Sequence, residues 1–151
     1  MSQSLSKLYV HLIFHIKNSL TPVKTEDKKD LYAYIGSIIK DNGSIPILIN
    51  GTRDHVHVFC VMSKNIALAM LTEEIKRHSS RWIKTRGPQY NQFAWQGGYA
   101  GFSVSQSLIE KTKRYIEVQE EHHKRMTFEE ELIAFLKEYG IEYDDRYLWA
   151  N

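Results

Sequence analysis

Apolar side chains alternate with other residues along the first part of the chain, which is the pattern of a β-strand with one buried face. We predict this strand over 7–17. Its apolar face carries Leu8, Val10, Leu12, Phe14 and Ile16. His11 and His15 fall on the other face. They could approach a functional site, but ordinary polar positions in a sheet are the commoner role, and we expect that role for both.

A second alternating segment predicts a β-hairpin over 45–62. Ile45 to Asn50 forms its first strand, and Asn50-Gly51 begins a tight turn. The returning strand alternates strictly, so its two faces carry different chemistry. One face carries His55, His57 and Phe59, and the other carries Val56, Val58 and Cys60.

Helical spacing of apolar residues predicts four helices. The first begins at Thr25, its expected N-cap, and ends at Asn42-Gly43. The second runs over about 64–85 and is capped by Ser63. The third and fourth run over about 108–122 and 128–139, and each begins with a capping box: Ser107 with Glu110, and Thr127 with Glu130.

The order of the predicted elements indicates the fold. A segment rich in glycine and aromatic residues, 93–105, supplies a fourth strand, so the order is β, α, β, β, α, β and then helices. This order matches the split βαβ, or ferredoxin-like, plan. We therefore expect an α+β fold with an antiparallel sheet, helices on one face and additional C-terminal helices. Residues 1–151 should form a single domain, with the strand of His55 inside the sheet.

Charge is distributed unevenly along the chain. Residues 117–151 contain ten acids and four bases, a net charge of −6, whereas residues 1–116 contain 16 bases and eight acids, a net charge of +8. Five bases cluster in the second helix and just after it: Lys76, Arg77, Arg81, Lys84 and Arg86. This basic stripe is either an ordinary solvated helix face or a surface that contacts nucleic-acid phosphates.

The compartment can also be predicted. The chain carries no signal-peptide pattern, and its apolar runs are too short to span a bilayer. Its one cysteine, Cys60, fits a reducing environment. We therefore expect a cytoplasmic protein without a membrane partner.

Two pairs of polar residues indicate a metal site. His55 and His57 share one face of a strand and could bind one metal ion, although hydrogen bonds could instead satisfy them in a buried strand. On the third helix, Tyr115 and Gln119 lie one turn apart on the side that faces the body of the protein. A buried amide needs a partner, and a metal ion is an economical one. Such a mixed set of ligands suits Mg²⁺ or Mn²⁺ better than a structural zinc ion.

These groups suit the cleavage of a phosphodiester bond. The metal ion would polarise a phosphoryl oxygen while the hydroxyl of Tyr115 attacks phosphorus and becomes a phosphotyrosine. The new linkage conserves the bond energy, so a strand 3′-OH can reverse the reaction. Tyrosine catalysis therefore favours the breaking and rejoining of strands over simple hydrolysis.

The sequence resembles the single-tyrosine HUH transposases of the smallest bacterial insertion sequences and their REP-associated relatives. The resemblance rests on His55-Val56-His57, on Tyr115 followed by Gln119, and on the segment from Trp95 to Val104. It implies a dimeric enzyme that acts on single-stranded DNA, often at imperfect hairpins, through a transient 5′-phosphotyrosine. It also implies a divalent metal ion held by both histidines and the glutamine.

Two other functions stay open: a non-catalytic nucleic-acid-binding module with the ferredoxin-like fold, and a metal-dependent phosphodiesterase that activates water. A covalent complex with DNA would distinguish a transposase from both. His122 and His123 lie outside the matching motif, so no catalytic role is assigned to them. In the family, the tyrosine helix can complete the site of a partner subunit, and the sequence does not decide whether it does so in this protein.

Overall fold

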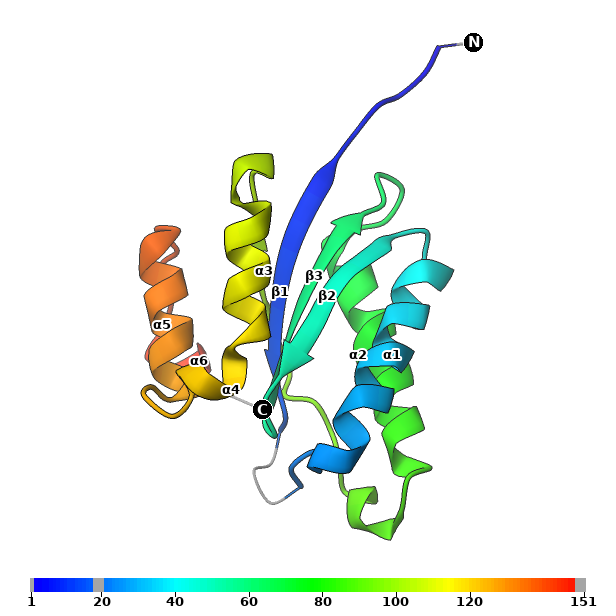
Figure 1. Cartoon of the computed structure of the whole chain (residues 1–151), viewed down its shortest axis with the longest axis vertical. Coiled ribbons are helices and arrows are strands. Elements are labelled where there is room, and N and C mark those ends of the chain that lie inside the picture. The colour runs from blue at the N-terminus through cyan, green and yellow to red at the C-terminus, as the bar shows by residue number, and fades with distance from the viewer. Residues whose placement is uncertain (1, 18–20, 149–151) are drawn as a thin grey trace.

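The computed structural model describes residues 2–17 and 21–148. Four strands form one antiparallel sheet: β1 (Leu8–His15), β2 (Ile45–Gly51), β3 (His55–Met62) and β4 (Ala100–Ser103). Their order is β2-β3-β1-β4, so β3 and β1 are the central strands (Figure 1). This is the sheet of the split βαβ plan, and the predicted fold class is confirmed.

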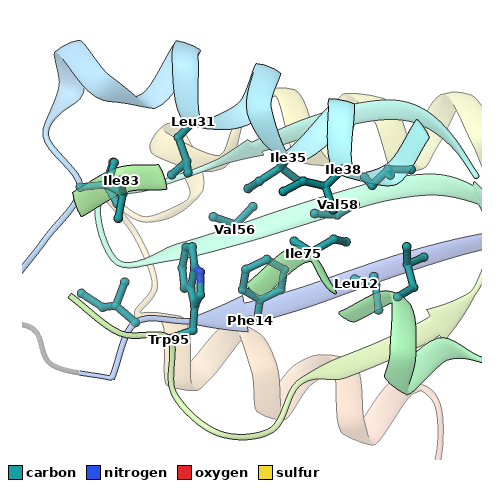
Figure 2. Packing of buried hydrophobic residues seen from close by; sticks show 14 of the residues in the cluster. Leu12, Phe14, Leu31, Ile35, Ile38, Val56, Val58, Ile75, Ile83 and Trp95 are labelled. Atoms are coloured by element: carbon teal, nitrogen blue, oxygen red, sulfur yellow. The ribbon is translucent and has the colours of Figure 1, made fainter. Parts of the chain in front are cut away.

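Two long helices, α1 (Thr25–Asp41) and α2 (Leu68–Lys84), pack together over one face of the sheet (Figure 1). The main hydrophobic core lies between them and the sheet (Figure 2). It contains Leu12 and Phe14 of β1, Val56 and Val58 of β3, and Leu31, Ile35 and Ile75 of the helices. Because side chains alternate along a strand, β3 sends its valines into this core and its histidines to the opposite face.

The C-terminal helices cover that opposite face. They are α3 (Ile109–Glu117), α4 (Gln119–His122), α5 (Phe128–Glu138) and α6 (Asp145–Leu148), and Figure 1 shows them across the sheet from α1 and α2. Ile13 of β1 and Phe102 of β4 pack against Phe128, Leu132 and Leu136 of α5. The sheet is therefore enclosed between two layers of helices.

The predicted helix over 108–122 is not continuous. It is interrupted at Val118, which separates α3 from α4, and a short 3-10 turn, Gln106–Leu108, precedes it. The predicted capping box of Ser107 and Glu110 does not form, because the N-cap of α3 has no side-chain hydrogen bond. Ser107 instead bonds to the hydroxyl of Ser105 at 3.0 Å.

The other predicted caps have mixed outcomes. The box of Thr127 and Glu130 is confirmed, since Thr127 Oγ1 accepts a hydrogen bond from Glu130 N at 3.2 Å. Thr25 is the first residue of α1 rather than its cap. Ser63 does not cap α2, which begins at Leu68; its hydroxyl accepts from Asn65 N in the preceding turn.

The fourth strand is shorter than predicted, since β4 spans only Ala100–Ser103 of the predicted 93–105. A 3-10 turn, Pro88–Tyr90, follows α2. Before β4 begins, Trp95 forms only an isolated bridge with Ile16, the residue after β1. The aromatic residues Tyr143 and Tyr147 near the C-terminus are exposed, and Trp149 lies outside the described residues. Among the helices that the structure describes, none is long and apolar enough to cross a membrane.

Candidate active site

The central strand β3 presents two histidines to the face that the C-terminal helices cover. His55 pairs with His15 of β1, and His57 pairs with Ile13, in the antiparallel register. Both imidazoles are buried, with exposed fractions of 1% and 0%. His15 stacks on Phe128 of α5, with ring centroids 4.7 Å apart. Because the β3 histidines are shielded from water, each must find polar partners within the protein.

Asn50, at the end of β2, holds the break between α3 and α4. Its Nδ2 donates hydrogen bonds to the carbonyl oxygens of Ile116 (2.8 Å) and Glu117 (3.2 Å). These carbonyls lie in the last turn of α3, where a helix leaves backbone oxygens without helical partners. The contact ties the break to the sheet and so positions the residues on either side of it.

Tyr115 and Gln119 flank that break and lie over the two histidines. Gln119 is fully buried, and its Oε1 lies 3.1 Å from His55 Nε2. The ring of Tyr115 lies 5.9 Å from that of His57, measured between centroids. A single chain therefore brings together all four residues to which the sequence assigned the metal site and the nucleophile.

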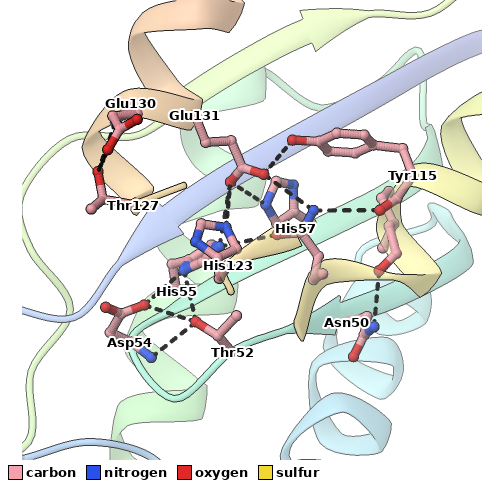
Figure 3. A network of polar contacts seen from close by, with 12 residues as sticks. Asn50, Thr52, Asp54, His55, His57, Tyr115, His123, Thr127, Glu130 and Glu131 are labelled. Carbon is pink, nitrogen blue, oxygen red and sulfur yellow. Dashed lines mark hydrogen bonds and ion pairs between the residues drawn. The ribbon is translucent and has the colours of Figure 1, made fainter. Parts of the chain in front are cut away.

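A carboxylate that the sequence analysis missed lies at the centre of this site. Glu131, from α5, is buried, and its Oε1 lies 3.0 Å from His57 Nε2 and 3.4 Å from His55 Nε2. Its Oε2 accepts hydrogen bonds from the hydroxyl of Tyr115 and, at 3.2 Å, from Gln119 Nε2 (Figure 3). One carboxylate therefore connects the tyrosine to both histidines.

Glu131 could have been found from the pattern of its helix. It lies three residues after Phe128 and four before Phe135, so it shares the face that this apolar stripe presents. A carboxylate on such a face is costly to bury unless it is paired, which makes it a candidate for a functional site. The motifs of the resemblance end at Gln119, so they do not include any residue of α5.

Two histidines without an assigned role also lie beside the site. His123 Nε2 is 3.2 Å from Glu131 Oε1, and its ring lies 4.4 Å from that of His55. The ring of His122 lies 4.5 Å from that of Tyr115. Both therefore belong to the surroundings of the site, although they lie outside the family motif.

Each histidine of β3 has a further polar partner that orients its ring. His55 Nδ1 lies 2.7 Å from Asp54 Oδ1 and 2.9 Å from Thr52 Oγ1. His57 Nδ1 lies 2.7 Å from His11 Nε2. The ordinary role expected for His11 was therefore wrong, because this residue is buried against the site. These contacts direct the Nε2 atoms of both β3 histidines toward the centre of the site.

Burial and the carboxylates act in opposite directions on the two histidines. Burial lowers the pKa of His55, but its hydrogen bonds with Asp54 and Glu131 outweigh burial and raise the pKa to about 9. For His57 burial prevails over Glu131, and the pKa falls to about 4. Burial acts to raise the pKa of Glu131, but its hydrogen bonds with both histidines hold it well below its usual range. Without metal, a protonated His55 therefore balances the charge of Glu131.

Tyr115 is held in its protonated form. Burial, and then the hydrogen bond and charge of Glu131, raise the pKa of the Tyr115 phenol well above its usual range. The phenol donates its hydrogen to Glu131 Oε2. The hydroxyl is therefore positioned, and an acceptor for its proton is already in contact with it.

The donor atoms at the centre of the site fit a divalent metal ion. The ligand atoms of His55, His57 and Glu131 lie within 4.8 Å of one another, and Gln119 Oε1 adjoins His55. Two imidazoles, a carboxylate and an amide oxygen form a mixed nitrogen and oxygen set of the kind that Mn²⁺ accepts. A bound ion would replace the proton of His55 as the partner of Glu131.

The predicted basic stripe lies on and just after α2, across the sheet from the helices that carry Tyr115 (Figure 1). Three of its members are bound within the chain: Lys76 to the carbonyl of Gln96 (2.9 Å), Arg77 to Glu74 (2.8 Å) and Arg86 to Asp30 (2.8 Å). Arg81 and Lys84 have no ion-pair partner within 2–17 and 21–148. The stripe is thus a surface separate from the candidate active site.

Two solved structures have similar folds. One, described as a candidate transposase from Deinococcus radiodurans, has a TM-score of 0.60 and 21% identity, over 79% of this chain and 98% of that one. The other is a REP-associated tyrosine transposase bound to a REP hairpin, with a TM-score of 0.59 and 13% identity, over 82% of this chain and 74% of that one. At these identities the likeness establishes the fold.

Most of the chain also matches a known protein family in sequence. No curated protein sequence matches the chain significantly. The model of the IS200-like transposases, however, matches residues 4–119, which contain both β3 histidines, Tyr115 and Gln119 but not Glu131. This match extends over most of the chain and includes the residues that meet in the site. The chain therefore belongs to the IS200-like transposase family.

Proposed function

We propose that this transposase cleaves and rejoins single-stranded DNA through a transient 5′-phosphotyrosine at Tyr115. The observation that carries the proposal is one buried cluster, in which Tyr115 and Gln119 meet His55 and His57 around Glu131. A purely structural tyrosine would not need a hydroxyl held against a buried carboxylate that also contacts two imidazoles. Membership of the transposase family supports the same chemistry.

In the proposed reaction, the oxygen of Tyr115 attacks phosphorus, the bond to the 3′ oxygen breaks, and the 5′ phosphate stays on the tyrosine. Glu131 Oε2, which already accepts the phenolic hydrogen, takes the proton that leaves the nucleophile. The departing 3′ oxygen takes up a proton from solvent and becomes a hydroxyl, and Glu131 returns its proton to solvent, so the step has no net change in protons. Attack by a 3′-OH on the phosphotyrosine reverses these steps and rejoins a strand.

The proposed metal ion is Mg²⁺ or Mn²⁺, with His55, His57, Gln119 and Glu131 as the residues that would hold it. When bound, it would draw charge from the phosphoryl group in the transition state. The chain itself orients the ligands, because Asp54 fixes the ring of His55 and His11 fixes that of His57.

Covalent capture of DNA tests this proposal. The protein is incubated with labelled single-stranded oligonucleotides, with and without hairpins, in Mn²⁺, in Mg²⁺ or in EDTA, and run on a denaturing gel. We expect a metal-dependent shifted band for the wild type and none for Tyr115→Phe, which keeps the ring but lacks the nucleophilic oxygen. Mass spectrometry should place the nucleotide on the peptide that contains Tyr115. A nucleotide on another tyrosine would refute the assignment.

The same gel separates the two alternative functions. A metal-dependent phosphodiesterase would cut the strand without a covalent band, and Tyr115→Phe would cut it as well. A non-catalytic binding module would shift DNA in a native gel but leave the strand intact. Neither alternative explains why the tyrosine hydroxyl contacts the same carboxylate as the histidines.

We also propose hairpin-containing DNA as the substrate, a homodimer as the assembly and the cytoplasm as the location. The structural neighbour bound to a REP hairpin supports the first proposal. The basic stripe on α2 would then contact DNA phosphates away from the cleavage site, with Arg81 and Lys84 as its unpaired charges. The homodimer rests on the family resemblance, since the site described here is assembled within one chain.

A further inference from the structure

A cleft of about 680 Å³ lies beside the candidate active site. Three segments line it: the start of α1, the turn between β2 and β3, and the connection from α4 into α5. Its volume falls within the range of pockets that hold ligands of nucleotide size. The basic stripe of α2 contributes no residue to it.

Two lining residues connect this cleft directly to the site. Asp54, in the turn after β2, lies 2.7 Å from His55 Nδ1. His123, after α4, lies 3.2 Å from Glu131 Oε1. A group bound in the cleft would therefore lie next to the residues proposed to hold the metal ion.

The cleft carries two arginines whose charges are not used within the protein. Arg53 and Arg125 are both exposed, and across the part of the chain that the structure describes neither side chain has an ion-pair or hydrogen-bond partner. The two lysines of the lining differ from them, because Lys28 pairs with Glu120 at 2.7 Å and Lys124 pairs with Glu121 at 3.0 Å.

Of the four acids of the cleft, Glu120 is paired with Lys28 and Asp54 is bonded to His55. Glu130 is hydrogen-bonded to the hydroxyl of Thr127, and within the described residues neither Glu129 nor Glu130 has an ion-pair partner, so both keep their charge. Arg53 and Arg125 lie on two separate connections beside the proposed site of phosphodiester cleavage. Both are suited to bind phosphates, because a planar guanidinium can bind two phosphate oxygens at once.

We infer that this cleft holds the stretch of DNA strand next to the scissile phosphate, with Arg53 and Arg125 binding its backbone phosphates. The inference rests on the proposed function, which supplies the strand and the cleavage position. It assigns the cleaved strand to the end of the sheet where the start of α1 meets the connection from α4 into α5, next to the site of Tyr115. The α2 stripe contributes no residue to this cleft and then has no direct part in holding that stretch of the strand.

Charge removal tests the inference. Arg53→Gln, Arg125→Gln and the double variant are compared with a matched double variant, Arg81→Gln with Lys84→Gln, which removes two unpaired charges from α2. The probe is a fluorescent hairpin oligonucleotide with a single-stranded extension, and anisotropy gives Kd over a range of salt. Because each single-strand phosphate contact contributes about 0.7 to the slope of log K against log salt, the cleft double variant should lower the slope by about 1.4. Thermal unfolding should be unchanged, since both arginines are exposed.

Neutral linkages locate the contact on the strand. A methylphosphonate is placed at one linkage at a time in the extension. Beside the cleavage position it should weaken binding to wild type but not to the cleft double variant, because the phosphate and the arginine act through one interaction. The same loss in both proteins at every linkage would refute the inference, as would an unchanged slope in the cleft double variant.

The proposed function and this inference fail in different ways. If the wild type forms no covalent adduct, the proposed function fails, whatever the arginines do. If the wild type forms the adduct but the cleft double variant binds and reacts like the wild type, only the inference fails. Loss of the methylphosphonate effect beside the cleavage position in the α2 double variant would also overturn it, because that phosphate would then be held by α2 instead of by the cleft.

Discussion

One buried carboxylate organises the site at the scale of single residues. Glu131 is shared by Tyr115, Gln119 and the two β3 histidines, so the positions of four side chains depend on the same two oxygen atoms. A buried anion is costly unless its lone pairs are used, and here both oxygens have partners. Glu131 is therefore the residue whose change should disturb the most contacts at once.

Glu131→Gln keeps the shape of the side chain but removes its charge. We expect the affinity for Mn²⁺ to fall by at least about tenfold, since the loss of a group that supports metal-binding histidines has effects of this size. Calorimetric titration of the purified protein measures this change. The control is Glu130→Gln, an exposed neighbour whose side chain contacts Thr127 instead of the site. Equal affinities for Glu131→Gln and the wild type would remove Glu131 from the proposed ligands.

The contact between Asp54 and His55 should make the stability of the metal-free protein depend on pH. The pKa of His55 is raised from 6.5 to about 9, because its hydrogen bonds with Asp54 and Glu131 outweigh burial. A raised pKa contributes stability that is complete below the unfolded value and is lost as the pH rises through the folded one. In EDTA, this contribution should therefore disappear between pH 6.5 and about 9.

Denaturant unfolding at a series of pH values measures this loss as the difference between wild type and Asp54→Asn. Comparison with the variant cancels the other groups that titrate in the same interval, such as Lys76, whose pKa burial lowers to about 8. We expect a flatter profile for Asp54→Asn. Parallel profiles for the two proteins would show that Asp54 does not hold the proton on His55.

The break between α3 and α4 matters most at the scale of elements. Gln119 is the first residue of α4, and its amide reaches both His55 Nε2 at 3.1 Å and the carbonyl of Tyr115 at 3.4 Å. Asn50 of β2 donates hydrogen bonds to the two backbone carbonyls that the break leaves without helical partners. The edge strand β2 therefore helps to set the distance between the tyrosine and the histidines.

Asn50→Ala should separate this positioning role from general stability. The loss of a side-chain hydrogen bond costs about 1 kcal/mol, so a modest drop in unfolding free energy is expected. The rate of adduct formation should fall more in Asn50→Ala than in a control variant of similar stability, because the break between α3 and α4 is no longer tied to the sheet. Asn42→Ala is the matched control, since Asn42 Nδ2 donates to the carbonyl of Ile38 at the end of α1, away from the site. Equal rates for the two variants would contradict the positioning role.

At the scale of the whole molecule, the sheet divides the chemistry from the basic stripe. The second helical layer carries the tyrosine, the glutamine and the missed carboxylate, and the first layer carries the stripe (Figure 1). A strand bound on both faces would have to pass around the edge of the sheet. The proposed homodimer would determine which edge of the sheet stays open.

The proposed homodimer predicts a mass near twice the 17.7 kDa of the chain in light scattering at micromolar concentration. A closed two-fold interface is the usual arrangement for such an assembly. The monomer mass at that concentration would overturn the proposal.

Mixed dimers report where each site obtains its tyrosine. Because Tyr115 contacts Glu131 of its own chain, we expect an equimolar mixture of Tyr115→Phe and His57→Ala chains to stay inactive after exchange of subunits. Recovery of covalent adduct in the mixture would mean that the tyrosine serves the partner's histidines. The adduct is measured on the same denaturing gel as in the test of function.

The fold and four residues of the candidate site can be predicted from local patterns in the sequence. Alternation alone predicts which side of β3 carries His55 and His57, and helical spacing predicts that Gln119 is buried beside them. Glu131 stands out as a carboxylate on the apolar face of α5, but the pattern of that helix does not say which sheet face it covers, and so the partners of Glu131 could not be predicted. His11 was assigned an ordinary role because its contact with His57 depends on how the strands and helices pack. The break at Val118 was missed for the same reason, since its partner, Asn50, lies on another strand.

The helix α5 lies beyond the family match, yet it covers part of the sheet that the match contains. A protein cut at residue 119 would keep every residue of the recognised motif. It would also expose Ile13 and Phe102 to water, because Phe128, Leu132 and Leu136 would be gone. Such an open apolar face promotes self-association. The shortest fragment that can be expected to remain dispersed in solution is therefore longer than the one that the motif defines.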